Sequence, residues 1–330
     1  MSATWSRRRF LTLTGALAGG TALVAAGCSK DEPGTVADDG SVTVKHVFGE
    51  TTIPRPPTRV VSAGYTGQDE LLAVGVVPVG ITEWFGNQPF AVWPWAQPKL
   101  GAAQPAVLNL NDGIGVDAIK ALTPDLIVAT NAGLDSDTYA TLSAIAPTVA
   151  QTGQDAFFEP WKDQAATIGQ AVFKYDDMTK LITAVDDAFT NAGKNNQSFG
   201  GKRALLVRGS FFGDRAVVTP SGWRTEFLTQ LGFTVPDAIG EFVDGGEALV
   251  PRERMVEVLD QADVLIWTTE SDAEQAALLA DPTFAELAAT KRNRNVLTGP
   301  ELAGAIAFAS VLSYLVVADR LPPMLAKVLG

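Results

Sequence analysis

The residues best suited to hold a ligand are aromatic, and they are crowded into one short segment. Trp84, Phe85, Phe90, Trp93 and Trp95 are five aromatic residues within twelve positions. The glycine, asparagine and proline residues among them disfavour a regular helix or a central strand, so the rings are predicted to lie on a loop. Ring faces bind apolar groups and cations. We interpret the segment as one wall of a ligand site, with simple packing inside the loop as the alternative.

Arginines supply the charge for a second wall. Arg208, Arg215 and Arg224 lie in or near loops of the second half, whereas the first half offers mainly rings. A charged wall opposite an aromatic wall suits an amphipathic ligand, while surface ion pairs are the alternative role of these arginines. Further candidates come from the segments after predicted strands, where the crevice of a parallel sheet opens. They are Tyr65, Asn131, Phe211, Phe212, Trp223, Trp267, Glu270 and Phe308.

Histidine and cysteine are nearly absent, which excludes several kinds of chemistry. The chain has one histidine, His46, which is expected at the surface, and one cysteine, Cys28. They cannot provide an internal disulfide, a zinc site built on His and Cys, or a Ser-His-Asp triad. Ser62 and Ser210 could be nucleophiles of an envelope hydrolase, but neither has a histidine base near it in the sequence. We therefore predict that the chain is not an enzyme.

The sequence also argues against nucleotides, nucleic acids and bare metal ions. The first predicted strand is not followed by a GxGxxG motif, and the sequence beyond the signal has no Walker loop. Asp and Glu number 37 against 25 Lys and Arg, and the resulting formal net charge of -12 repels phosphate backbones. A bare metal ion would need a cage of carboxylates, because histidine and thiolate ligands are missing. Neither a direct metal site nor a cofactor is expected.

The elements that would position the candidate residues alternate between strand and helix. In the first half, strands are predicted at 60–61, 76–81, 125–130 and 148–150, with helices at 68–74, 116–122 and 136–145. The second half repeats the pattern with strands at 204–207 and 264–267 and helices at 225–231, 252–259 and 311–329. This alternation predicts two Rossmann-like α/β lobes with central parallel sheets. Apolar spacing over 176–194 predicts one long helix that bridges the lobes as a stiff strut.

The N-terminal region is predicted to direct export. Arginines at 7–9 precede Phe10, Leu11 and an uncharged run to Ala26, so the start of the chain resembles a twin-arginine export signal. Small residues before Cys28 resemble a lipobox, which predicts a signal peptide over 1–28 and lipidation of Cys28. Residues 29–41 are predicted to be a flexible tether. The rest divides into an N-terminal lobe at 42–155, a bridging helical segment at 156–197 and a C-terminal lobe at 198–330.

Short motifs along nearly the whole chain carry a resemblance to a known family. They are TRVVS at 58–62, GYTGQD at 64–69, GVVPVG at 75–80, LTPDLI at 122–127, ATNAGL at 129–134, IAPTV at 145–149 and LAGA at 302–305. With them the chain resembles the substrate-binding lipoproteins of iron-siderophore ABC transporters. These proteins belong to the helix-bridged class that includes the vitamin B12 and ferric hydroxamate binders. The motifs are specific for the class but do not identify the ligand.

The resemblance implies capture of a ferric siderophore between the lobes and its delivery to a membrane ABC permease for iron uptake. Iron then enters only as part of the chelate, and the protein is expected to be a lipid-anchored monomer on the outer face of the cytoplasmic membrane. In this family acidic residues on each lobe meet arginines of the permease, and the matching positions are Asp135 or Asp137 and Glu253. Their alternative role is favourable placement at helix N-termini.

Two questions about the ligand stay open at this point. Haem or a corrinoid is the alternative to a siderophore, because an aromatic cleft accepts a flat macrocycle. Catecholate chelates are anionic and hydroxamate chelates are closer to neutral, so arginines in the cleft would show which is preferred.

Overall fold

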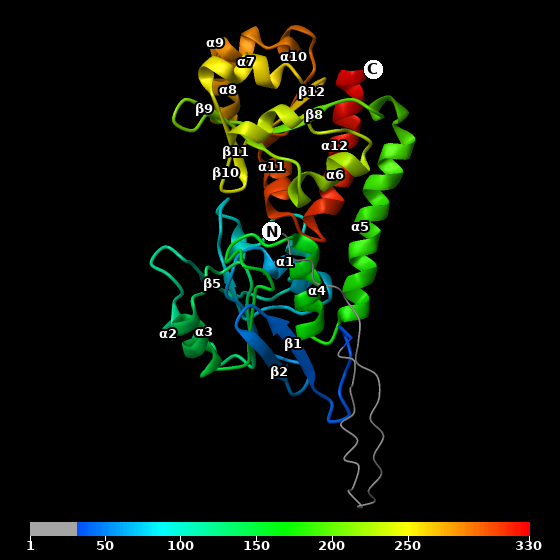
Figure 1. Cartoon of the computed structure of the whole chain (residues 1–330). Coiled ribbons are helices and arrows are strands. Elements are labelled where there is room, and N and C mark those ends of the chain that lie inside the picture. The colour runs from blue at the N-terminus through cyan, green and yellow to red at the C-terminus, as the bar shows by residue number, and fades with distance from the viewer. Residues whose placement is uncertain (1–31) are drawn as a thin grey trace, which may run out of the picture. The chain divides into compact units, whose positions relative to one another are not determined.

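The computed structural model describes residues 32–330 (Figure 1). The predicted export signal, the lipobox and Cys28 lie outside the described residues. Residues 33–41, which the sequence placed in a flexible tether, belong to the compact unit that runs from Pro33 to Gly330. There, Gly34 and Val36 line a surface hollow together with Tyr175. Within residues 32–330, no helix has the length and apolar character needed to cross a membrane.

The N-terminal lobe contains a small hairpin and a parallel sheet. The hairpin consists of β1 (Val42–His46) and β2 (Gly49–Ile53). The sheet has the order β5-β4-β3-β6-β7, and every neighbouring pair in it is parallel. Its strands are β3 (Val60–Ser62), β4 (Gly80–Thr82), β5 (Ala106–Leu108), β6 (Leu126–Ala129) and β7 (Thr148–Ala150). The inner strand β6 is buried along its whole length, as a parallel strand covered on both faces should be.

Helices and short 3-10 turns connect these strands. The helices are α1 (Gly67–Ala73), α2 (Val116–Ala121), α3 (Ser136–Ser143) and α4 (Trp161–Ala171), and the 3-10 turns are η1 (Pro89–Ala91) and η2 (Gln97–Lys99). The predicted strand at 76–81 is mostly loop, because only its end belongs to β4. Two 3-10 turns follow β4 where most other strands of this lobe are followed by a helix, and the first of them, η1, lies inside the aromatic segment 84–95.

The C-terminal lobe has a mixed sheet of order β10-β11-β9-β8-β12-β13. Its strands are β8 (Ala204–Arg208), β9 (Arg215–Thr219), β10 (Val243–Asp244), β11 (Glu247–Pro251), β12 (Val264–Thr268) and β13 (Asn295–Leu297). Only β8, β12 and β13 are parallel, so the two-lobe α/β class is confirmed while the second sheet differs from the expected parallel one. The loop from β8 to β9 is too short for the crossover that a parallel pair needs.

Helices cover both faces of this sheet. They are α6 (Glu226–Gln230), α7 (Arg252–Leu259), α8 (Asp272–Ala280), α9 (Pro282–Glu286), α10 (Ala288–Lys291), α11 (Gly299–Phe308) and α12 (Ser313–Leu329), with 3-10 turns η3 (Gln197–Phe199), η4 (Trp223–Thr225) and η5 (Asp237–Phe242). Alternate residues of β12 enter two different cores: Val264 and Ile266 join one, and Leu265 and Trp267 join the other. Strand β12 is therefore covered on both faces of the sheet.

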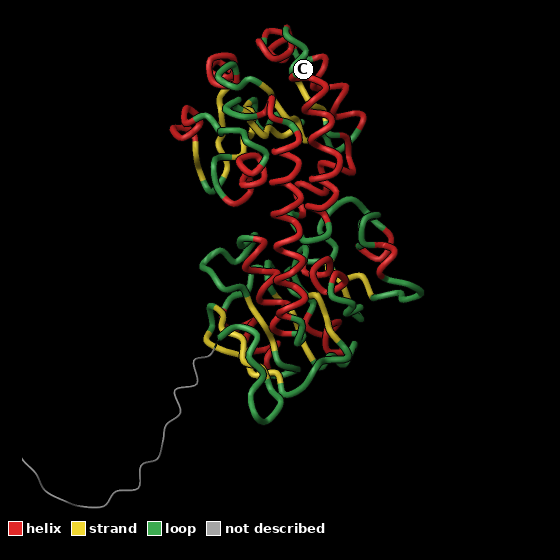
Figure 2. The backbone as a smooth tube through the Cα atoms, turned by 90° about the vertical axis from the view of Figure 1, so that its right-hand side faces the viewer, coloured by secondary structure: helices red, strands yellow, loops and turns green. Residues whose placement is uncertain are grey.

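One long helix passes from the first lobe to the second (Figures 1 and 2). This helix, α5 (Tyr175–Asn195), has 21 residues and is about 32 Å long at 1.5 Å per residue. Met178 near its start lies against Gly169 of α4, whereas Phe189 packs on Tyr314 of α12 and Phe227 of α6. The predicted bridging helix is therefore present, with one more residue at each end than expected.

Two buried acidic residues form a second connection between the lobes. Asp69 of α1 accepts hydrogen bonds from Trp95 Nε1 at 2.7 Å and from Ser310 Oγ at 2.6 Å, and Ser310 lies between α11 and α12. Glu70 is also fully buried and faces the Val311 amide at 3.4 Å. Burial raises the pKa of Asp69 to about 6, and burial together with Asp69 raises the pKa of Glu70 well above its usual value. As the pH rises, the folded protein therefore keeps the proton on Glu70 up to a higher pH than the unfolded chain does.

We predict that Glu70→Gln changes how stability depends on pH. The pKa of Glu70 is higher in the folded state, so its favourable contribution is complete below about pH 4 and is lost as the pH rises. Glutamine cannot ionise, so the variant should match the native protein near pH 4 and exceed it in free energy of unfolding near neutral pH. The difference should grow by up to about 1.4 kcal/mol per pH unit. Urea denaturation across this range measures it.

The matched control is Glu50→Gln, which changes an exposed glutamate of β2. It should leave the pH profile of the native protein unchanged. Parallel profiles for Glu70→Gln and the native protein would contradict the assignment of the retained proton to Glu70.

Candidate ligand-binding cleft

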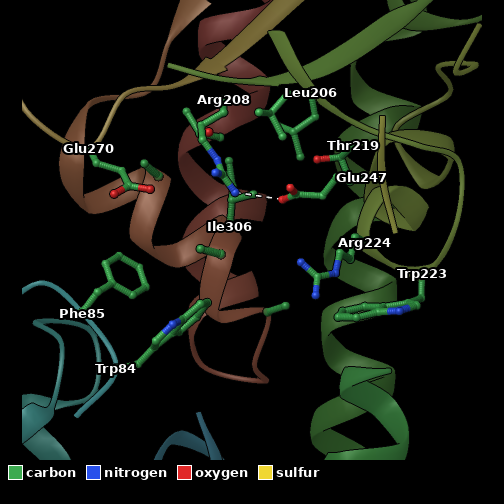
Figure 3. A pocket seen from close by; sticks show the side chains of 15 residues that line it. Trp84, Phe85, Leu206, Arg208, Thr219, Trp223, Arg224, Glu247, Glu270 and Ile306 are labelled. Carbon is green, nitrogen blue, oxygen red and sulfur yellow. Dashed lines mark hydrogen bonds and ion pairs between the residues drawn. The ribbon is translucent and has the colours of Figure 1, made fainter. Parts of the chain in front are cut away.

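A hollow of about 340 Å³ is lined by residues of both lobes (Figure 3). Trp84 and Phe85 reach it from the loop after β4, and Arg208, Trp223 and Arg224 reach it from the second lobe. A neighbouring hollow of about 680 Å³ shares Trp84 and both arginines and adds Asp155, Phe157 and Phe158. We call the two hollows together the cleft. The sequence placed Trp84, Phe85, Arg208, Trp223 and Arg224 at such a site, and the structure brings all five together.

The first side of the cleft is aromatic. We define the aromatic wall as Trp84, Phe85, Phe157 and Phe158. The Trp84 ring lies 4.6 Å from Phe85 and 4.8 Å from Phe158, measured between ring centroids. Gly86 has a φ of 93°, and a Cβ atom there would lie 2.5 Å from the Trp93 ring, so only glycine allows this turn. The turn directs Trp84 and Phe85 into the cleft and Trp93 away from it.

A second layer of rings supports the aromatic wall from behind. Tyr65 stacks on Trp84 at 5.7 Å, and Phe308 of α11 lies 5.6 Å from Trp84. Trp93 stacks on Trp95 at 4.9 Å, and its ring lies so close to Gly304 of α11 that a Cβ atom would approach it to 2.4 Å. Trp93 and Phe308 are 5% and 3% exposed. These four residues were predicted to bind ligand, but they lie behind the wall and none of them lines either hollow.

The second side of the cleft carries the charges. We define the charged wall as Arg208, Arg224, Glu247 and Glu270. Arg208 Nη2 lies 2.8 Å from Glu247 Oε1, and both side chains project from the face of the sheet that Leu206 and Thr219 also present to the cleft. Leu206 pairs with Thr219 in the β8–β9 register, and Glu247 is level with Thr219 on β11. The antiparallel strands therefore bring an acidic residue beside the arginine that ends β8.

Arg224 lies between two rings. Its guanidinium carbon is 4.8 Å from the Trp223 ring centroid and 5.1 Å from that of Phe158. Burial lowers the pKa of Arg224, and Glu247, Tyr314 and Asp155 oppose that effect. The group remains cationic at physiological pH, because a guanidinium is effectively always protonated in proteins. Arg224 thus offers a fixed, partly desolvated positive charge next to the aromatic wall.

Four other predicted ligand residues lie outside the cleft. Asn131 is buried, and its Oδ1 accepts the Glu159 amide at 3.0 Å. Trp267 is 0% exposed, and its Nε1 donates to Asn295 Oδ1 at 3.0 Å. Phe211 packs edge-on against Trp267, and Phe212 is 64% exposed on the β8–β9 loop. The strand-end rule fails for these residues because a chain leaving a strand also turns into the core or away from the crevice.

Sequence reasoning missed several cleft residues. Phe157 and Phe158 follow β7, so the rule that selected Tyr65 could have found them. Asp155 precedes them on the same loop. Glu247 gave no signal, because it starts a strand whose antiparallel pairing the sequence did not predict.

The predicted docking residues are exposed at helix starts. Asp135 precedes α3 and accepts the Thr138 amide at 2.7 Å, and hydrogen bonds to Thr138 lower its pKa. Asp137 and Glu253 lie in the first turns of α3 and α7. Their proposed role in docking stays a prediction.

Two residues considered for chemistry, His46 and Ser62, are buried and do not line the cleft. His46, expected at the surface, is buried, and its Nε2 lies 2.9 Å from Thr51 Oγ1 and 3.3 Å from the Tyr139 hydroxyl. Ser62 is buried at the end of β3. In residues 32–330, no three His, Cys, Asp or Glu side chains are grouped as a metal site. The cleft instead offers rings, guanidinium groups and carboxylates to a molecule bound whole.

Comparison with known proteins places this geometry in context. Residues 60–302 match the periplasmic binding protein family. The crystal structure of a periplasmic solute binding protein from Mycobacterium smegmatis str. MC2 155 superposes with a TM-score of 0.85. Its sequence is 66% identical to this chain, and the match covers 89% of this chain and 100% of that one.

Two curated proteins of Bacillus subtilis (strain 168) are more distant relatives. The probable siderophore-binding lipoprotein YfiY is 30% identical, and the match covers 65% of this chain and 65% of YfiY. The putative ABC transporter substrate-binding lipoprotein YhfQ is 28% identical, with 64% of each protein covered. The matches therefore span slightly less than two thirds of the length of these relatives.

We predict that Trp267→Ala lowers the free energy of unfolding, because Trp267 is a core residue that does not line the cleft. The substitution leaves a cavity in the core between β12 and its covering helices, and such losses cost about 3–5 kcal/mol of unfolding free energy. Phe212→Ala, which removes an exposed ring, should change the stability by less than about 0.5 kcal/mol. Urea denaturation measures both. If Trp267→Ala and Phe212→Ala had equal free energies of unfolding, Trp267 would not be a core residue.

Proposed function

The chain belongs to the periplasmic binding protein family, and we propose that it captures a ferric siderophore in the cleft and delivers it to an ABC permease. The observation that carries the proposal is the pairing of an aromatic wall from one lobe with a charged wall from the other around one hollow. The name of the relative YfiY, a probable siderophore-binding lipoprotein, supports the ligand class.

The chemistry of a siderophore complex fits these two walls. Such a chelate has oxygen atoms around the iron and organic groups around its periphery. Arg224 can donate charge-assisted hydrogen bonds to the oxygens, and Trp84 and Phe158 can contact the organic groups. Iron stays bound to the siderophore, so the protein needs no metal ligands and no cofactor of its own. The role is binding and release, without catalysis.

We also propose that the protein acts at the outer face of the cytoplasmic membrane. An export signal of the twin-arginine type would carry the chain across, and lipidation of Cys28 would anchor it. Both relatives from Bacillus subtilis are named lipoproteins, which supports an anchor. On this proposal the permease docks on the exposed acidic residues Asp135, Asp137 and Glu253, and the binding protein works as a monomer.

We predict that ferric siderophores quench the tryptophan fluorescence of residues 29–330, a segment that contains the whole compact unit. Trp84 and Trp223 line the cleft, so a bound ferric complex lies within reach of both rings. Free Fe(III), haemin and cyanocobalamin should give much weaker saturable quenching. If haemin or cyanocobalamin bound more tightly than the siderophores, the proposed ligand would be a macrocycle and not a siderophore. If free Fe(III) bound more tightly than the siderophores, the proposal that the protein transports a chelate would be overturned.

Arg224→Gln tests the role of the charged wall in the same titration. Loss of the guanidinium should raise the Kd for the bound ferric siderophore about tenfold, which corresponds to about 1.4 kcal/mol. Arg215→Gln removes the same charge from β9 at a position outside the cleft lining and should change the Kd less than about twofold. Equal effects of the two variants would show that only the overall charge matters.

Cys28→Ala tests the anchor in cells. The variant should leave the membrane fraction, because the acyl chains that hold the protein cannot be attached. Ser29→Ala keeps the cysteine and should remain in the membrane fraction. Retention of Cys28→Ala in that fraction would contradict lipidation at this residue.

A further inference from the structure

Glu270 is an exposed carboxylate in the lining of the cleft. The 340 Å³ hollow is lined by two acidic residues, Glu247 and Glu270. Glu247 is held by Arg208 at 2.8 Å. Across residues 32–330, no lysine or arginine forms an ion pair with Glu270 among the contacts found, although Arg208 is near enough to lower its pKa. Glu270 therefore presents to the hollow a negative charge that Arg208 offsets only in part.

The backbone around Glu270 is held firmly. Thr269 is 0% exposed, its amide donates to Thr298 Oγ1 at 3.2 Å, and its Oγ1 accepts the Gly299 amide at 3.0 Å. On the other side, Ser271 is the N-cap of α8, and its Oγ accepts the Glu274 amide at 3.1 Å. The Glu270 amide itself donates to the Glu274 carboxylate. These contacts fix the backbone from which the exposed Glu270 side chain projects toward the hollow.

The surroundings make the negative charge of Glu270 unfavourable in the empty cleft. The walls of the hollow partly desolvate the carboxylate, and Glu274 adds a like charge, so the pKa of Glu270 is raised, while Arg208 opposes this. A cation from a ligand would remove this penalty. Phe85 lies on the same side of the hollow as Glu270 (Figure 3), and its ring face can also attract a cation.

The charged side chains of the cleft lie in a sequence from one side to the other. Glu270 stands on one side, Arg224 stands on the opposite side, and the Arg208–Glu247 ion pair lies between them (Figure 3). The paired groups largely neutralise each other, so the cleft has a negative end at Glu270 and a positive end at Arg224. Such a bipolar site favours a ligand with a cationic group at one end and oxygen acceptors at the other.

From this geometry we infer that Glu270 is a subsite for a primary ammonium group of the siderophore and that the cleft selects cationic ferric hydroxamates. This inference rests on the proposed function and narrows its substrate class. Hydroxamate groups cancel the charge of ferric iron, so an added ammonium makes the whole chelate cationic. A ferric tris-catecholate core is strongly anionic, and it would place negative charge against Glu270 and Glu247.

Ferrioxamine B and its N-acetylated form are a matched pair of probes. Both carry the same ferric trihydroxamate core, but only ferrioxamine B has a primary ammonium group. Residues 29–330 should bind ferrioxamine B about tenfold more tightly than the acetylated form in the fluorescence titration. Glu270→Gln should reduce this ratio to near one by weakening ferrioxamine B alone. Asp272→Asn, which removes a charge from the exposed first turn of α8, should keep the ratio.

Each result of this experiment decides the inference. Equal affinity of the native protein for the two probes would overturn it, as would a preference that survives Glu270→Gln. If the protein bound ferric enterobactin but neither ferrioxamine, the inference would also be overturned. The proposed capture of siderophores would still stand in that case. Failure of ferrioxamines, ferrichrome, ferric citrate and ferric enterobactin alike would overturn the inference and the proposed function together. Thermal melting of Glu270→Gln confirms that the variant is folded.

Discussion

The contact of Trp93 with Gly304 determines where the two walls of the cleft stand. Trp93 belongs to the loop after β4 of the first lobe, and Gly304 lies on α11 of the second. No side chain fits between the ring and this helix, because a Cβ atom on residue 304 would lie 2.4 Å from the ring. The loop that carries Trp84 and Phe85 is thereby seated on α11. The aromatic wall keeps its position relative to the charged wall as long as this contact holds.

Other contacts between the lobes strengthen the same arrangement. Asp69 joins Trp95 to Ser310, and α5 packs against both lobes along its length. A helix and a buried polar contact resist bending more than paired loops do, so large hinge motions are disfavoured. A protein of this build presents a nearly preformed cleft, which reduces the ordering cost of binding. On the proposed function, ligand release would depend on small displacements of the lobes.

The chemistry of the cleft divides between support and contact. Buried rings behind the aromatic wall, such as Phe308, contribute packing energy and orientation, while Trp84 and Arg224 remain accessible to a ligand. On the other side, the Arg208–Glu247 ion pair satisfies two charges within the protein, and on the proposed function Arg224 and Glu270 would meet the charges of the ligand. Charges that are not paired within the protein can give such a site its selectivity, and the rings add to its affinity.

The sequence by itself determined the two α/β lobes, the long helix α5, and the aromatic loop, because these follow from local periodicity, composition and turn residues. It also identified Trp84, Phe85, Arg208, Trp223, Arg224 and Glu270 from their places after strands or on loops. Only the tertiary structure decided which rings line the cleft and which, like Trp93 and Trp267, are buried. The pairing of Arg208 with Glu247 required the antiparallel register of β9 and β11. Contacts between residues distant in the chain depend on packing across lobes and strands, and local pattern carries no record of them.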